Sequence, residues 1–265
     1  MVDQSVVDEV RSLGLATSDF EFRERYDRLL SAVAASIARS SRDEHNMVMS
    51  GFYEFIIKNS ASSNSQLFQD LWVAYESNEK RDGYFVEFGA CDGVYLSNTH
   101  LLEKVYGWTG IIGDPNPRYK KALRKNRTCR VTNRCIFPGP RRRRTFRCTD
   151  DGAFSTLEEF AQLDSNWDRH RSSNYEHVNV YTVSINDVLE EFGAPRVIDY
   201  LSLDTEGSEF AILQDLDFGR WKIGLITVEH NYTPNREKIH DLLTRNGYLR
   251  KLDAISKWDD WYVKQ

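Results

Sequence analysis

Acidic and polar side chains follow two short apolar runs in the second half of the chain. Asp204 and Glu206 end the run in LSLDTEG, and Glu229, His230 and Asn231 end the run in ITVEHN. Apolar runs of this length are typical of buried parallel strands. Ligands of open α/β sheets bind beyond the carboxyl ends of the strands. We therefore expect the two groups to converge on one site.

Two kinds of chemistry fit these side chains. Oxygen ligands such as Asp204, Glu229 and Asn231 suit Mg²⁺ or another hard divalent cation, which would lower the pKa of an acceptor hydroxyl and orient it. Without a metal, Glu206 or His230 is a candidate general base. Simpler interpretations also stay open, because a loop histidine is often only hydrogen-bonded and strand-end acids often cap helices. We predict that Asp204, Glu206, Glu229 and His230 form the catalytic group.

A glycine turn follows an earlier apolar run, in VEFGACDG. The run ends at Gly89 and Gly93 follows four residues later, so the backbone can turn tightly beside a ligand. The pattern is not GxGxxG, which disfavours a nicotinamide-dependent oxidoreductase. Glu87 and Asp92 would repel a pyrophosphate but attract a ligand with an ammonium group and a sulfonium. The signs of charge therefore favour S-adenosylmethionine over a dinucleotide.

Asp114, in IIGDPNP, ends the next apolar run, roughly twenty residues after the glycine turn. In Rossmann-like folds an acid at this place accepts hydrogen bonds from ribose hydroxyls. Asp before Pro is also typical of a simple turn or helix cap. Its spacing from the glycine turn favours ribose binding.

Strand and helix patterns alternate along most of the chain, which predicts a three-layer α/β fold with a mostly parallel sheet. We expect a helical N-terminal extension over residues 1–62 and one Rossmann-like domain over 63–265. The predicted strands are 83–89, 110–115, 129–137, 178–185, 199–207, 223–231, 248–255 and 259–265, the last two forming a hairpin. The predicted helices are 18–38, 46–58, 66–80, 96–107, 116–126, 186–193 and 235–248.

Composition excludes several classes of protein. The 265 residues carry a net charge of -5, which gives no overall electrostatic footprint for nucleic acid. We expect no membrane span and no secretory signal, because no apolar stretch reaches about 20 residues and the N-terminus is acidic. The four cysteines lack metal-ligand or disulfide spacing, which is typical of reduced thiols in a cytoplasmic protein.

The segment 138–176 is long and polar for a connection, and such segments are usually functional. It begins with the basic run Arg141 to Arg144, which follows Pro138-Gly139-Pro140 and is predicted to lie on an exposed loop. Guanidinium groups bind carboxylates and phosphates, so an anionic acceptor is one interpretation of the run. A solvated basic loop is the other.

Several motifs in order resemble the FkbM-type methyltransferase family. They are SQLFQD (65–70), GYFVEFGACDGVYLSNTHLLE (83–103), GWTGIIGDPNP (107–117), IDYLSLDTEGSEF (198–210) and the TVEHN strand. The resemblance covers about three quarters of the chain and leaves the first sixty residues outside. It implies a class I methyltransferase fold, S-adenosylmethionine as donor, and O-methylation of a sugar, glycan or natural-product scaffold.

The resemblance also assigns residues to the cofactor. Glu87, Gly89 and Asp92 would line its methionine end, and Asp114 would hold its ribose. The full set that we expect at the cofactor is Gln69, Glu87, Gly89, Ala90, Asp92, Ser97, Asn98, Asp114, Pro115, Asn116 and Asp204. Asp114 stands where the family more often has glutamate, so a shorter side chain must reach the ribose. Cys91 replaces a small polar residue.

We therefore expect an S-adenosylmethionine-dependent O-methyltransferase with a small-molecule or glycan acceptor. The N-terminal helices are a candidate homodimer contact. Two alternatives stay open: a nicotinamide-dependent oxidoreductase, and a cofactor-binding partner protein without catalytic activity.

Overall fold

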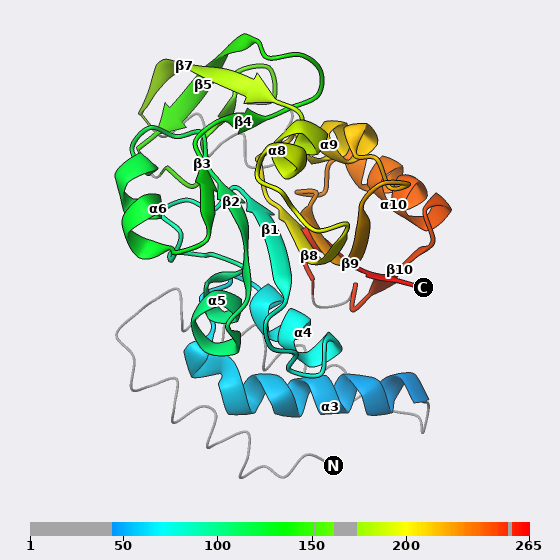
Figure 1. Ribbon diagram of the computed structural model, residues 1–265. Coiled ribbons are helices and arrows are strands. Elements are labelled where there is room, and N and C mark those ends of the chain that lie inside the picture. The colour runs from blue at the N-terminus through cyan, green and yellow to red at the C-terminus, as the bar shows by residue number, and fades with distance from the viewer. Residues whose placement is uncertain (1–43, 151, 162–173, 254–255) are drawn as a thin grey trace.

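The computed structural model describes residues 44–150, 152–161, 174–253 and 256–265. Its centre is a seven-stranded sheet with the strand order β10-β11-β9-β8-β1-β2-β3 (Figure 1). The strands are β1 (Tyr84–Phe88), β2 (Thr109–Gly113), β3 (Arg130–Thr132), β8 (Val197–Leu203), β9 (Lys222–Glu229), β10 (Tyr248–Lys251) and β11 (Asp259–Lys264). All neighbours pair in parallel except β11, which runs antiparallel to both β9 and β10.

This arrangement confirms the predicted fold class, a Rossmann-like three-layer α/β domain of the class I methyltransferase type with a C-terminal antiparallel hairpin. The apolar central strands β1 and β8 pair with each other and are buried, as strands covered on both faces must be. The parallel strands β1, β2, β8 and β9 all end at the same edge of the sheet. The loops after them therefore meet there.

Helices cover both faces of the sheet (Figure 1). One face packs on α3 (Glu44–Asn59), α4 (Gln69–Glu76), α5 (His100–Tyr106) and α6 (Lys120–Asn126). The other packs on α8 (Ile185–Glu191), α9 (Glu209–Asp215) and α10 (Asn235–Arg245). Neighbouring residues of one strand divide between the two cores: Phe85 lies in the first and Val86 in the second. This alternation is the expected geometry of a strand buried on both sides.

The predicted helix at 46–58 is α3, followed by a 3-10 turn at Ser60–Ser62. Its Phe52 and Ile56 are buried and share a core with Trp72 and Trp261 of the sheet domain. This part of the predicted extension is therefore packed onto the sheet domain, and the boundary at residue 62 stays a prediction. The predicted helix at 18–38 lies outside the described residues.

A second, four-stranded sheet has the order β4-β7-β5-β6 and lies beyond the first (Figure 1). It contains β4 (Cys135–Ile136), β5 (Arg143–Thr149), β6 (Thr156–Leu157) and β7 (Tyr175–Val183). Two predictions are corrected here. The expected strand 129–137 divides into β3 and β4, which belong to different sheets. The expected strand 178–185 overlaps β7, which is not in the main sheet, and its last residue, Ile185, begins α8.

The burial pattern of β7 explains the second correction. Its exposed Glu176, His177 and Asn179 show that much of the strand faces solvent. One solvated face is typical of antiparallel strands, whereas strands of the main parallel sheet are covered on both faces. The helix α9 was not predicted, because Asp204 and Glu206 were assigned to the end of the expected strand 199–207 and no helix was assigned to the residues after it.

Candidate active site

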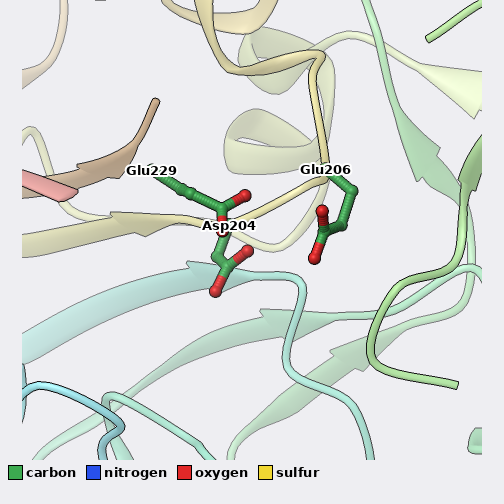
Figure 2. A group of neighbouring side chains, drawn as sticks. All are labelled: Asp204, Glu206 and Glu229. Atoms are coloured by element: carbon green, nitrogen blue, oxygen red, sulfur yellow. The ribbon is translucent and has the colours of Figure 1, made fainter. Parts of the chain in front are cut away.

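Three carboxylates meet where β8 and β9 end (Figure 2). Each of Asp204, Glu206 and Glu229 offers one oxygen, and these oxygens all lie within 4.8 Å of one another. Glu206 and Glu229 are buried, and Asp204 is half-buried. We call these residues the acid trio. The structure thus brings together three of the four side chains predicted to be catalytic.

Glu229 has the most unusual environment of the acid trio. It is 6% exposed, and its Oε2 has no hydrogen-bond partner within the described residues. Burial, followed by the charges of Asp204 and Glu206, raises the pKa of Glu229 well above its usual value. An unpartnered buried carboxylate beside two other acids is suited to accept a proton or to bind a cation.

His230 is turned toward a different cluster. Its Nδ1 accepts the backbone N–H of Tyr232 at 3.0 Å, and its Nε2 lies 3.6 Å from Oδ1 of Asp260. Asp260 in turn pairs with Arg236 and Arg250. Among the described residues, His230 is not a member of the acid trio. Its imidazole therefore fits the simpler interpretation left open above, a loop histidine that is hydrogen-bonded within the protein.

Asn231, the third predicted metal ligand, is buried directly after His230. Its backbone N–H donates to the carbonyl of Trp258 at 3.2 Å, and its φ is +45°. The structure adds Glu206 to the predicted pair Asp204 and Glu229 as an oxygen donor. A metal-ligand role for Asn231 stays a prediction.

The glycine turn after β1 lies directly against the loop of the acid trio. Gly89 has a φ of +90°, and a Cβ at this position would collide with the backbone carbonyl of Asp204. The backbone N–H of Asp204 donates to the carbonyl of Phe88 at 3.0 Å. Glycine is therefore required both for the conformation and for the close approach of the two loops. Ala90, the next residue, is fully buried.

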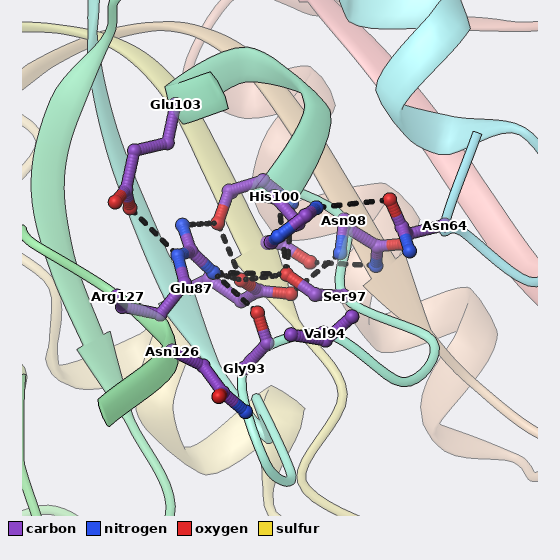
Figure 3. Close-up of polar contacts among 12 residues, drawn as sticks. Asn64, Glu87, Gly93, Val94, Ser97, Asn98, His100, Glu103, Asn126 and Arg127 are labelled. Carbon is purple, nitrogen blue, oxygen red and sulfur yellow. Dashed lines mark hydrogen bonds and ion pairs between the residues drawn. The ribbon is translucent and has the colours of Figure 1, made fainter. Parts of the chain in front are cut away.

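Glu87 holds the glycine turn from within (Figure 3). Its Oε2 accepts the hydroxyls of Ser97 at 2.9 Å and Thr99 at 2.5 Å, and its Oε1 accepts the backbone N–H of Asn98 at 2.6 Å. The side chain is 3% exposed. Since both oxygens are engaged inside the protein, Glu87 organises the turn. The preference for a cationic cofactor over a pyrophosphate, which was inferred from Glu87 and Asp92, then depends on Asp92.

Arg127, which sequence reasoning did not single out, completes this cluster (Figure 3). Its buried guanidinium donates to Oε2 of Glu103 at 2.6 Å, to Oγ1 of Thr99 at 2.9 Å and to Oγ of Ser97 at 3.1 Å. It also lies 3.6 Å from Oε2 of Glu87. Although burial opposes the shift, Arg127 and Thr128 lower the pKa of Glu103 to about 2.

Asp92 and Asn98 lie at the two ends of the turn. Asp92 is half-buried, and its Oδ1 accepts the backbone N–H groups of Val94 and Tyr95, both at 2.8 Å. Asn98 donates from Nδ2 to Oγ of Ser202 at 3.0 Å, whereas its buried Oδ1 has no partner within the described residues. Asp92 and the Asn98 amide are therefore the polar groups of this turn that retain capacity for a ligand.

Asp114 connects the glycine turn with the loop after β2. Its Oδ2 accepts the backbone N–H of Cys91 at 3.0 Å, and its Oδ1 accepts that of Asn116 at 2.8 Å. Burial is the main cause that raises the pKa of Asp114 to about 7, while the two hydrogen bonds lower it. Each oxygen retains a lone pair for a further donor. Pro115 is half-buried, and the Nδ2 of Asn116 donates to Oγ of Ser155 at 3.2 Å.

Gln69 is also engaged within the protein. Its Nε2 donates to Oδ2 of Asp259 at 2.7 Å, and its Oε1 accepts the backbone N–H of Leu67 at 2.8 Å. Burial and then the charge of Asp204 raise the pKa of Asp259 well above its usual value. Asp259, which the sequence did not indicate, is thus a fourth acid near the trio, held by Gln69.

The profile of the FkbM methyltransferase domain matches residues 87–253, more than half of the chain. The chain belongs to the FkbM methyltransferase family. Membership implies S-adenosylmethionine as the methyl donor. The matched range contains the acid trio, Asp114 and Arg127, whereas Gln69 and Asp259 lie outside it.

Solved structures similar to this FkbM-family chain are distant. The precorrin-6y C5,15-methyltransferase of Geobacter metallireducens has 10% identity and a TM-score of 0.40, covering 73% of this chain and 86% of that one. A protein designated an RNA methyltransferase, from Pyrococcus horikoshii, has 11% identity and a TM-score of 0.36, with coverages of 74% and 81%. No curated protein matches the chain.

The basic run of this FkbM-family chain lies only in part on the predicted loop. Arg141 and Arg142 precede β5, and Arg143 and Arg144 are its first residues. Arg144 pairs with Glu159 at 2.6 Å. The first three arginines are exposed, as predicted.

Among the described residues, no helix is both long and apolar enough to cross a membrane.

Proposed function

We propose that this protein transfers the methyl group of S-adenosylmethionine to a hydroxyl oxygen of a sugar, glycan or natural-product acceptor. Family membership supports the donor. The observation that carries the proposal is the contact between the glycine turn and the acid trio, where Gly89 leaves no room for a side chain beside Asp204. A donor bound at the turn would present its methyl group to carboxylates that can receive a proton.

On the donor side, Asp114 is suited to accept hydrogen bonds from ribose hydroxyls. Asp92 and the Asn98 Oδ1 are the groups nearest in sequence that retain capacity for an ammonium donor. Glu87, Arg127 and Gln69 act as positioning residues, because their polar atoms already bind other parts of the protein. S-adenosylmethionine supplies an electrophilic methyl group when bound.

On the acceptor side, Glu229 is the strongest candidate general base. Burial and the neighbouring acids raise its pKa well above the usual value, which makes its carboxylate a stronger proton acceptor. The acceptor oxygen would form its bond to the methyl carbon as the carbon–sulfur bond breaks, and the hydroxyl proton would pass to the carboxylate. Asp204, which is half-buried, would orient the acceptor. Such positioning in near-attack geometry supplies much of the rate in methyl transfer.

The acid trio also fits a hard divalent cation. Three carboxylate oxygens within 4.8 Å and the unpartnered Oε2 of Glu229 form an oxygen donor set of the kind that Mg²⁺ prefers. A cation held there would lower the pKa of the acceptor hydroxyl. Asp204, Glu206 and Glu229 are the residues that would hold it.

An isotope-transfer experiment tests the proposed function. The protein is incubated with methyl-labelled S-adenosylmethionine and a pool of small-molecule and glycan acceptors, and mass spectrometry detects the labelled product. Glu229→Gln should lower turnover by about 100-fold or more and leave the affinity for S-adenosylhomocysteine nearly unchanged. Asp241→Asn, an exposed acid on α10, is the control. Full turnover in Glu229→Gln would remove Glu229 as the general base.

A further inference from the structure

The outer face of the second sheet exposes arginines and aromatic rings together. Strands β5 and β7 pair so that Arg143 lies opposite Tyr181 and Arg147 opposite His177. Tyr175 and Tyr181 are 46% and 50% exposed. Phe146, Cys148 and Val180 alternate with these positions and form the buried core beneath. We define the Arg-Tyr face as Arg141, Arg143, Arg147, Tyr175, His177 and Tyr181, all of which are exposed except Arg147, which is 5% exposed.

Two arginine–tyrosine pairs mark the ends of this face. The guanidinium carbon of Arg141 lies 4.7 Å from the ring centre of Tyr181, and that of Arg147 lies 4.0 Å from the ring centre of Tyr175. Both distances are typical of cation–π contacts. The two tyrosines are six residues apart on one extended strand, which places them roughly 20 Å apart. A ligand that reaches both pairs must be an extended chain.

The charge of the Arg-Tyr face indicates an anionic ligand. Within the described part of the chain, no ion pair is formed by Arg141, Arg142 or Arg143, whereas Arg147 shares Glu158 with His177. The unpaired positive charge is therefore concentrated at Arg141, Arg142 and Arg143, although the whole chain carries a net charge of -5. Exposed guanidinium groups without acidic partners are suited to bind carboxylates or sulfates in a bidentate way.

The second sheet and the residues next to it are hydrogen-bonded to, and packed against, the loops of the candidate active site. Thr156 of β6 donates its hydroxyl to the backbone carbonyl of Glu206 at 2.6 Å. Asn116, two residues beyond Asp114, donates to Ser155 at 3.2 Å. Phe160 lies against Gly207 of the acid-trio loop. A chain bound to this sheet is thus held by the same structural unit that supports the donor site and the acid trio.

We propose that the Arg-Tyr face binds an acidic oligosaccharide, as the extended part of an acceptor whose reacting hydroxyl reaches the acid trio. This inference rests on the proposed function and names its substrate class. Tyrosine rings and guanidinium groups together suit a chain that alternates apolar sugar faces with anionic groups. A guanidinium covers one face of each tyrosine, so each pair offers one ring face beside a positive charge, which suits a sugar ring that carries an anionic group.

Binding measurements test this proposal. The full chain is titrated with oligogalacturonate, with heparin fragments and with uncharged malto-oligosaccharide, the first two separating carboxylate from sulfate recognition. We expect the wild type to bind at least one acidic glycan and not the neutral one. Replacing Arg141, Arg142 and Arg143 together by Gln should weaken that binding by about tenfold or more, because two exposed arginines of the Arg-Tyr face and the exposed Arg142 between them lose their charge.

A matched control removes the same charge from another exposed surface. Replacing Lys120, Lys121 and Lys125 of α6 by Gln should leave glycan binding unchanged. The proposal is overturned if neither acidic glycan binds, if both triple variants bind equally, or if single-stranded poly(U) binds more tightly than both glycans. The affinity for S-adenosylhomocysteine is measured in parallel. If the wild type does not bind S-adenosylhomocysteine, the proposed function is contradicted, whatever the Arg-Tyr face binds.

Discussion

At the scale of single residues, the ionised carboxylate of Glu229 is destabilising to the protein that buries it. Glu229 is buried, has an oxygen without a partner, and lies beside two further carboxylates. Burial and the like charges favour its protonated form, so ionising it in the folded protein costs free energy. Such an arrangement is typical of a site that needs its acids for binding or proton transfer.

The raised pKa of Glu229 gives a stability prediction. A carboxyl whose pKa is higher in the folded than in the unfolded chain stabilises the fold fully below its unfolded pKa, and this contribution is lost as the pH rises through the folded pKa. Glu229→Gln does not titrate and should therefore have a higher Tm than the wild type, by a margin that grows with pH. Thermal unfolding between pH 5 and 9, in the absence of metal, measures the margin.

The same variant tests the cation site. Mg²⁺ should raise the Tm of the wild type, more so as rising pH favours the Glu229 carboxylate, and raise the Tm of Glu229→Gln much less. Asp241→Asn serves as the control, with wild-type behaviour expected throughout. A margin that does not change with pH would contradict the environment assigned to Glu229, and an equal Mg²⁺ effect in both proteins would contradict the cation site.

At the scale of elements, one buried ion-pair cluster sets the shape of the glycine turn. Arg127 follows α6, yet its side chain binds residues on β1, on the turn and on α5. Removing one partner of a buried ion pair leaves the others uncompensated, which typically costs about 3–5 kcal/mol. The turn that would hold the donor is thus stabilised by a residue from the next helix–strand connection.

Arg127→Met should lower the free energy of unfolding by about 3–5 kcal/mol and also weaken S-adenosylhomocysteine binding, since Glu87 would no longer hold the turn in place. Denaturant unfolding and calorimetry measure the two effects. Leu243→Ala, a fully buried leucine of α10, should cost a similar 2–5 kcal/mol without changing the affinity of the folded protein. Equal affinity losses in both variants would show that the Arg127 effect is global unfolding.

These elements also show what the sequence can predict. Amphipathic and apolar periodicity was sufficient for β1, β2, β8 and β9, and hence for the edge where Asp114 and the acid trio lie. Arg127 and Asp259 were missed, because a basic residue after a helix and an acid in a late strand carry no local signal for contacts made far along the chain. Glu87 was identified, but its engagement by Ser97 and Asn98 requires the folded turn.

At the scale of the whole molecule, the main sheet and the second sheet divide the proposed task. The main sheet brings the glycine turn, Asp114 and the acid trio to one edge. The second sheet is hydrogen-bonded to that edge through Thr156, and the basic run lies at the start of its strand β5 and just before it. The sequence indicated the basic run but not the sheet, because β7 shows one solvated face and the other strands of this sheet are short or follow polar segments.

The central claim is that the glycine turn after β1 and the loop after β2 bind S-adenosylmethionine, with Asp114 as a hydrogen-bond acceptor. Calorimetric titration of S-adenosylhomocysteine and NAD at pH 8 and pH 6 tests it most directly. Because Asp114 has a pKa of about 7 and accepts hydrogen bonds best when ionised, the wild type should bind S-adenosylhomocysteine more tightly at pH 8. Asp114→Asn should bind it weakly at both pH values, and NAD should bind to neither protein. Binding of NAD in place of S-adenosylhomocysteine, or wild-type affinity in Asp114→Asn, would contradict the account.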